Sequence, residues 1–215
     1  HAALVNAEAL RRSSVSENTK TEGGIIEVKD AKLTGILIDN AIDLVAKIIP
    51  TPSKKEARLA LLSAQKNCFA VGLTTVDDAG LEKQVVDLID EMQKNGELKI
   101  RVYAMLTDNK ENLDYFLEKG RYKTERLNVR SFKFYSDGAL GSRGACLLHP
   151  YSDKPEQQGF LLSKPEYFAE MAQKVLEKGF QMNTHCIGDS AVRLILNIYG
   201  KLFMDHISKE SRTPS

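Results

Sequence analysis

The chain has 215 residues, and 30 Lys and Arg against 29 Asp and Glu leave a formal charge of +1. That balance gives no electrostatic reason to expect a nucleic acid or a membrane surface as partner. Hydrophobic residues make up 42% of the chain, enough for a buried core, and no apolar run approaches the roughly 20 residues of a membrane span. Three cysteines without a CxxC pair exclude a typical disulfide scaffold and favour a reducing, cytoplasmic compartment.

Residues 1–69 are predicted to form a helical insertion that packs on the domain after it. The expected elements are a helix over about 1–12, a polar loop over 13–24, a short strand over 24–28, and helices over 39–49 and 54–67. Because the chain opens on His1 without a methionine, we expect it to be a piece of a longer protein.

From residue 70 onward, short apolar strands alternate with helical patterns. Strands are predicted over 71–76, 99–106, 129–135 and 180–185, and helices over 81–92, 110–119, 165–178 and 189–203. Four successive strand–helix units indicate a parallel sheet, either open and doubly wound or part of a (β/α)₈ barrel. No glycine-rich nucleotide fingerprint follows a strand, which favours the barrel. These units are expected to span 70–207, with a polar tail over 208–215.

Functional groups of parallel α/β folds gather at the C-terminal ends of the strands, and His185 stands at such an end. A neutral imidazole there suits Zn, Fe or Ni. The alternative is a hydrogen-bonded core histidine, and no other histidine lies nearby in sequence to decide between the two.

Lys133 is unusual because it lies inside an apolar strand, on the same face as Ser131 and Tyr135. A buried lysine is costly unless it is paired or modified. It could pair with Asp137, point outward with its stem under a helix, form a Schiff base, or carry a carbamate that binds metals.

The loop over 136–145 contains three glycines and Arg143, and the connection continues to about Phe160. Such a length is typical of a lid or a binding loop, and a guanidinium is suited to clamp a carboxylate or a polarised carbonyl. The alternative is a series of turns in which glycine serves only the backbone conformation.

Two sequence blocks are specific: K-x-x-x-D-G-A-L-G-S-R-G-A over 133–145 and H-x-I-G-D over 185–189. Further blocks in the same order lie at 1–6, 33–37, 72–80, 150–153 and 179–183. Together they resemble amidohydrolase family 3, the group that includes N-substituted formamide deformylase, from residue 1 to about residue 200.

The resemblance implies an α/β fold, a partial TIM (β/α)₈ barrel of the metal-dependent hydrolase type, holding strands two to five plus an N-terminal insertion. It implies a divalent metal, with zinc expected and one or two ions. Lys133 matches the carboxylated lysine and His185 the fifth-strand histidine among the family's ligands. The resemblance also implies three residues that contact the substrate and two residues that support the site without contacting the substrate. The substrate contacts are His1, Asp137 and Arg143; the supporting residues are Asp78 and Asp189, the latter capping its helix or orienting His185.

The family's His-x-His pair, sixth-strand histidine and general-base aspartate have no match in this sequence. The resemblance therefore implies that the complete protein hydrolyses a C–N bond (amide, formamide or cyclic amide) of a small molecule through metal-activated water, while this chain alone is inactive. The alternative is an inactive half-barrel that serves as an interaction or structural module, since it would leave two sheet edges unpaired. Assembly into a homo-oligomer remains open.

Overall fold

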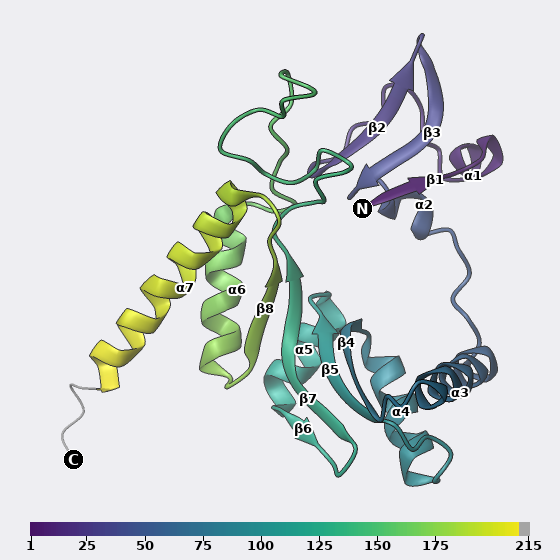
Figure 1. Cartoon of the computed structure of the whole chain (residues 1–215), viewed down its shortest axis with the longest axis vertical. Helices are drawn as coiled ribbons and strands as arrows, with labels where there is room; N and C mark the ends of the chain where they lie inside the picture. The colour runs from purple at the N-terminus through teal and green to yellow at the C-terminus, as the bar shows by residue number, and fades with distance from the viewer. Residues whose placement is uncertain (211–215) are drawn as a thin grey trace. The chain divides into compact units, whose positions relative to one another are not determined.

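The computed structural model describes residues 1–210 (Figure 1), and the chain forms two compact units. The first unit contains His1–Pro50, Tyr135–Ala172 and the segment from Thr184 onward. The second unit contains Thr51–Phe134 and Gln173–Asn183. No helix within residues 1–210 is both long and apolar enough to cross a lipid bilayer.

The N-terminal part of the first unit is a three-stranded antiparallel sheet with the strand order β1-β3-β2. Its elements are β1 (Ala2–Leu4), α1 (Ala7–Arg12), β2 (Gly24–Lys29), β3 (Lys32–Asp39) and α2 (Asp43–Ala46). The helix predicted over 1–12 is wrong at its start, because the first residues pair with β3 and the helix begins only after the cap Asn6. Residues expected to be a helical insertion therefore also contain a sheet, and the strand predicted over 24–28 is confirmed.

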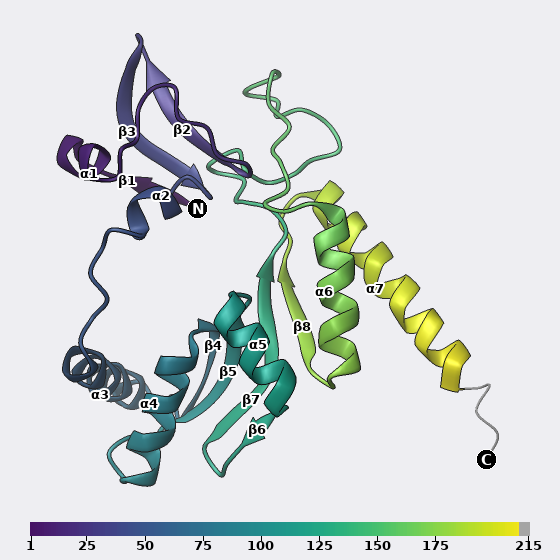
Figure 2. The ribbon, with the colours of Figure 1, turned by 180° about the vertical axis from the view of Figure 1, so that it is seen from behind.

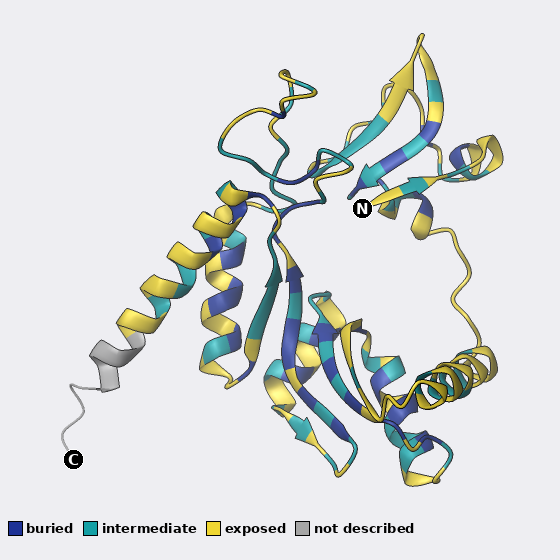
Figure 3. Ribbon diagram, in the orientation of Figure 1, coloured by how far each residue is buried: buried dark blue, intermediate teal, exposed yellow. Residues whose placement is uncertain are grey.

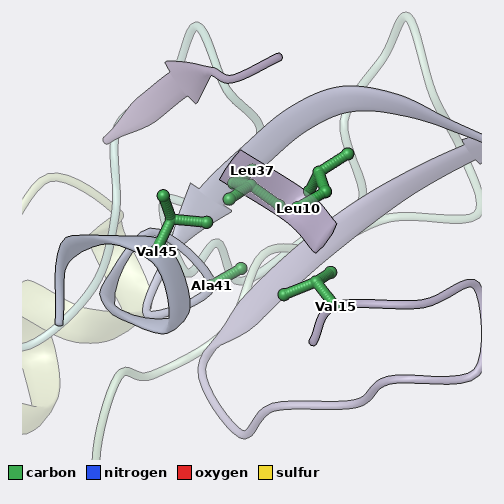
Figure 4. Close-up of a cluster of buried hydrophobic side chains, with 5 residues drawn as sticks. All are labelled: Leu10, Val15, Leu37, Ala41 and Val45. Carbon is green, nitrogen blue, oxygen red and sulfur yellow. The ribbon is translucent and has the colours of Figure 1, made fainter. Parts of the chain in front are cut away.

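A small apolar core holds this sheet and its two short helices together. Figure 4 shows its five buried side chains, Leu10, Val15, Leu37, Ala41 and Val45. Leu37 comes from β3, and its burial positions the end of that strand, where Asp39 lies. The helix predicted over 39–49 is reduced to the four residues of α2.

The larger sheet is mixed, with the order β4-β5-β7-β6 and with β8 paired to β7. β4, β5 and β7 are parallel neighbours, and the short β6 is antiparallel to β7. Its strands are β4 (Thr75–Leu81), β5 (Arg101–Thr107), β6 (Tyr122–Lys123), β7 (Leu127–Tyr135) and β8 (Gln181–His185). The fold is thus α/β as predicted, and residues 1–210 do not close a barrel.

The helices that follow the strands agree with prediction. They are α4 (Lys83–Lys94), α5 (Lys110–Lys119), α6 (Pro165–Glu177) and α7 (Asp189–Glu210), and α3 (Lys54–Ala70) precedes β4. Figures 1 and 2, seen from opposite sides, show α4 and α5 on one face of the β4-β5-β7 sheet. Ile89 and Met92 of α4 and Phe116 of α5 are buried, as their helical spacing predicts.

The first strand of the predicted series is displaced toward the C-terminus. A strand was expected over 71–76, but α3 ends in a turn in which the amide of Leu73 donates to the carbonyl of Cys68 (2.9 Å) and Gly72 has φ +80°. β4 therefore starts at Thr75 and includes Asp77 and Asp78, which were expected to follow the strand. Pairing with β5 outweighs the local turn preference of these residues.

Figure 3 shows many exposed residues along α3 and α7, and some of them are large apolar residues. α3 contains no buried residue, and its Leu59 is 57% exposed. In α7, Leu196 is 63% and Phe203 56% exposed. An apolar face without a partner marks a surface to which another part of a protein can bind.

Candidate functional site

The first unit brings His1 and His185 together with Asp39. Asp39 ends β3, and its carboxylate oxygen Oδ1 lies 2.7 Å from the Nδ1 atom of His1. The backbone amide of Asp39 donates to the carbonyl of His1 (3.1 Å), so the pairing of β1 with β3 fixes both residues. The side chain of His1 is 27% exposed and that of Asp39 is fully buried.

Three aromatic rings meet at this point. The ring of His185, at the end of β8, lies with its centroid 4.7 Å from that of His1 and 5.4 Å from that of Tyr135. The rings of His1 and Tyr135 are 6.3 Å apart and nearly perpendicular. Segments from the beginning, the middle and the end of the chain thus form one cluster within this unit.

One ring nitrogen of His185 has no hydrogen-bond partner within residues 1–210. Its Nε2 atom is buried and has no hydrogen-bond partner among the described residues. Its carbonyl accepts from both the amide (2.9 Å) and the hydroxyl (2.6 Å) of Ser136, which fixes the backbone at the strand end. A buried nitrogen without a partner is costly, and it fits a metal ligand or a group that binds substrate.

The carboxylate of Asp39 lies against two glycines of the loop after β7. A Cβ atom at Gly138 or at Gly144 would stand 2.2 Å from its Oδ2 atom. Burial raises the pKa of this carboxyl; the nearby Asp137 also raises it, whereas His185 lowers it. Oδ2 is buried without a hydrogen-bond partner within the described part of the chain.

Asp137 is fully buried, and its carboxylate joins two loops of the same unit. Oδ2 accepts from the backbone amides of Cys146 and Gly188, both at 2.8 Å, and Oδ1 accepts from the amide of Ile187 at 3.0 Å. The loop after β7 is therefore fixed to the loop after β8, next to His185. The contact of Asp137 with substrate stays a prediction; its hydrogen bonds shown here are all to the protein.

Arg143 and Asp189 also bind other parts of the loops. The guanidinium of Arg143 pairs with Asp153 at 2.7 Å, and this pair raises the pKa of Arg143 and lowers that of Asp153. The carboxylate of Asp189, the first residue of α7, accepts from the amides of Leu148 and Ser190 (2.8 and 2.9 Å). Asp189 thus orders the loop and the start of α7.

Lys133 and Asp78 belong to the second unit. Lys133 is half-buried in β7, where it pairs in register with Thr107 of β5. Asp78 lies in β4 with an exposed side chain, although partial desolvation raises the pKa of its carboxyl. Among the described residues, no three His, Cys, Asp or Glu side chains are close enough together to hold a metal ion.

Asp39 and Tyr135 are the two residues of the cluster that sequence reasoning missed as site residues. Both end strands, which is a signal that could have identified them. β3 itself had a signal that was not used, an apolar run over 33–38 that follows the Asp30-Ala31 turn after β2. Without that strand, nothing placed Asp39 near the loop after β7.

Known proteins resemble this chain over most of its length. The sequence profile of the amidohydrolase family matches residues 1–212. The chain is 31% identical to the putative amidohydrolase YtcJ of Bacillus subtilis, over 94% of this chain and 39% of that protein. It is also 31% identical to the protein LONG AFTER FAR-RED 3 of Arabidopsis thaliana, over 93% of this chain and 36% of that protein.

Two solved structures share the fold. An uncharacterized metal-dependent hydrolase from Pyrococcus horikoshii superposes with a TM-score of 0.73 at 25% identity, over 94% of this chain and 40% of that one. One from Pyrococcus furiosus gives 0.71 at 27% identity, over 94% and 42%. The chain thus spans about two fifths of the length of the proteins that it matches. It belongs to amidohydrolase family 3.

Proposed function

We propose that the complete protein hydrolyses a C–N bond of a small amide, formamide or cyclic amide with water, and that this chain supplies part of its metal site. Family membership and the two metal-dependent hydrolases of similar fold support this proposal. The observation that carries it is the buried Nε2 atom of His185, which ends a strand and has no partner among the described residues.

In this proposal His185 and a carboxylated Lys133 are ligands of the metal, and β4, β5, β7 and β8 are strands two to five of the barrel. A divalent metal, with zinc expected and one or two ions, would polarise the carbonyl and activate the water. His1 and Arg143 bind the substrate, and Asp137 and Asp189 hold the loops around it. No residue of this chain is proposed as the general base.

A carbamate on Lys133 can be detected directly in the complete protein. After equilibration with ¹³C-bicarbonate, we expect a ¹³C carbamate resonance that is absent from the Lys133→Met variant. Lys123→Met is the matched control, because Lys123 is exposed in the short strand β6. The control should keep both the resonance and the release of amine from a panel of formamides, amides and cyclic amides. Hydrolysis that persists in Lys133→Met would refute the role of this lysine.

A second candidate function, an interaction module without catalysis, is favoured by the exposed apolar side chains of α3 and α7. It requires that the 215-residue chain be stable by itself. Sedimentation and urea unfolding of that chain test it. A monomer that unfolds cooperatively supports the module, whereas aggregation through the open faces indicates that the chain needs the rest of the protein.

A further inference from the structure

We infer that Asp39 is a positioning residue, which orients the imidazole of His1 so that its Nε2 atom contacts a polar group of the substrate beside His185. The inference rests on the proposed function and adds a residue to it.

The hydrogen bond between the two residues leaves one ring nitrogen of His1 for another partner. Asp39 binds Nδ1 at 2.7 Å, and a carboxylate there selects the orientation and the protonated nitrogen of an imidazole. The side chain of His1 is 27% exposed whereas that of Asp39 is fully buried. The imidazole is therefore the end of the pair that a ligand can reach.

The ring of His1 lies beside the proposed metal ligand. Its centroid is 4.7 Å from that of His185, with 34° between the two ring planes. A small molecule bound at His185 would therefore come within reach of the His1 ring. Tyr135 borders the same space, with its ring centroid 5.4 Å from that of His185.

The surroundings of Asp39 fix its carboxylate in place. The residue has φ +49°, a left-handed conformation that aspartate tolerates better than most residues. Its Oδ2 atom takes up space that a Cβ at either Gly138 or Gly144 would need. The loop can contain no larger residue at these two positions while the carboxylate stays where it is.

The second carboxylate oxygen of Asp39 makes this arrangement energetically costly. Oδ2 is buried and has no hydrogen-bond partner among residues 1–210, and leaving such a group unpaired is costly. Local costs of this kind are typical of sites where function decides the arrangement. The side-chain hydrogen bond that the structure shows for this carboxylate joins Oδ1 to His1.

A double-mutant cycle on the complete protein tests the inference, with the panel compound that is hydrolysed fastest as substrate. The variants are Asp39→Asn, His1→Gln and the two combined. We expect each single variant to lower kcat/KM by about 10–100-fold, mainly through a higher KM, with the metal content unchanged. In the His1→Gln background, Asp39→Asn should add no further loss, because Asp39 acts through His1. Equal losses in both backgrounds would overturn the inference.

A second comparison uses the glycines. Gly138→Ala should displace the Asp39 carboxylate and raise KM as Asp39→Asn does, whereas Gly141→Ala, with no atom within 4 Å of its added Cβ, should not. A Gly138→Ala enzyme with an unchanged KM would contradict the inference. Thermal unfolding of both variants shows whether a change in KM is accompanied by a loss of folded protein.

The ring nitrogens of His1 provide a readout that needs no activity. In ¹⁵N-histidine spectra of the complete protein, assigned with His1→Gln, Nδ1 should carry the proton in the native protein and lose this preference in Asp39→Asn. A protein that hydrolyses no panel compound but shows this change would refute the proposed function and leave the orientation of His1 by Asp39 intact. Spectra unaffected by Asp39→Asn would refute the orientation itself.

Discussion

The carboxylate of Asp137 accepts a 2.8 Å hydrogen bond from the backbone amide of Gly188, 51 residues further along the chain. The same carboxylate binds the amides of Ile187 and Cys146. One buried side chain thus holds the ends of two loops, and one of these loops begins directly after His185 at the end of β8.

Replacement of Asp137 by alanine should therefore destabilise the protein. Three backbone amides lose their acceptor, and each buried donor left unpaired costs about 1–3 kcal/mol. We expect the free energy of unfolding in urea to fall by about 3 kcal/mol or more. Asp153→Ala is the matched control, since it removes only an exposed ion pair with Arg143 and should change the free energy of unfolding much less than Asp137→Ala does. Similar losses in both variants would contradict the structural role of Asp137.

Alanine should lower the stability of the protein at Gly188, just before α7, and raise it at Gly200, inside α7. A Cβ at Gly188 would stand 1.9 Å from the carbonyl oxygen of Cys146, so Gly188→Ala should cost about 1–3 kcal/mol. Gly200 lies inside α7 with no atom within 4 Å of an added Cβ, so Gly200→Ala should stabilise by about 0.5–1 kcal/mol. Thermal unfolding measures both. A Gly188→Ala protein as stable as the native one would show that Gly188 does not lie against the carbonyl oxygen of Cys146.

The attachment of α3 should weaken in acid in the isolated 215-residue chain. α3 contains no fully buried residue. Its Lys54 and Arg58 pair with Glu91 of α4, at 2.6 and 2.7 Å, and Arg58 also pairs with Glu97, which follows α4. Hydrogen bonds from these cations lower the pKa of both glutamates below their ordinary value of 4.5. The folded state therefore binds fewer protons than the unfolded state, so this stabilisation is present above pH 4.5 and is lost as the pH falls through the lowered pKa values.

Hydrogen-exchange protection factors of the α3 amides measure this effect. The protection factors should fall as the pH drops below 4.5. In high salt this fall should begin at a higher pH, because salt screens exposed ion pairs. Arg58→Ala should lower the protection at neutral pH and remove much of its pH dependence. Protection that is unchanged between pH 6 and 3.5 would show that other contacts hold the helix.

Local sequence patterns predicted the elements whose stability is local. α5 was predicted at its observed bounds from its helical pattern and from Gly120, which ends it, and the structure adds Asn109 as the cap at its start. The half-buried Lys133 and the strand end at His185 were found in the same way, from alternation and strand position.

Features that depend on pairing between distant segments could not be predicted. β1 and β3 contact each other across more than 30 residues, and β1, with only three residues, has no distinctive pattern of its own. Asp39 and its contact with His1 follow from that pairing. Likewise, nothing in the turn-like residues Asp77 and Asp78 indicates that β5 draws them into a strand.

The metal content of the complete protein tests the central claim most directly. Elemental analysis should find one or two divalent ions per chain in the native protein and in the control His149→Ala, whose histidine is exposed on a loop. His185→Ala should lose at least one of these ions, because the buried Nε2 atom is its proposed ligand. Equal metal content in His185→Ala and His149→Ala, or a native protein without metal, would contradict the account.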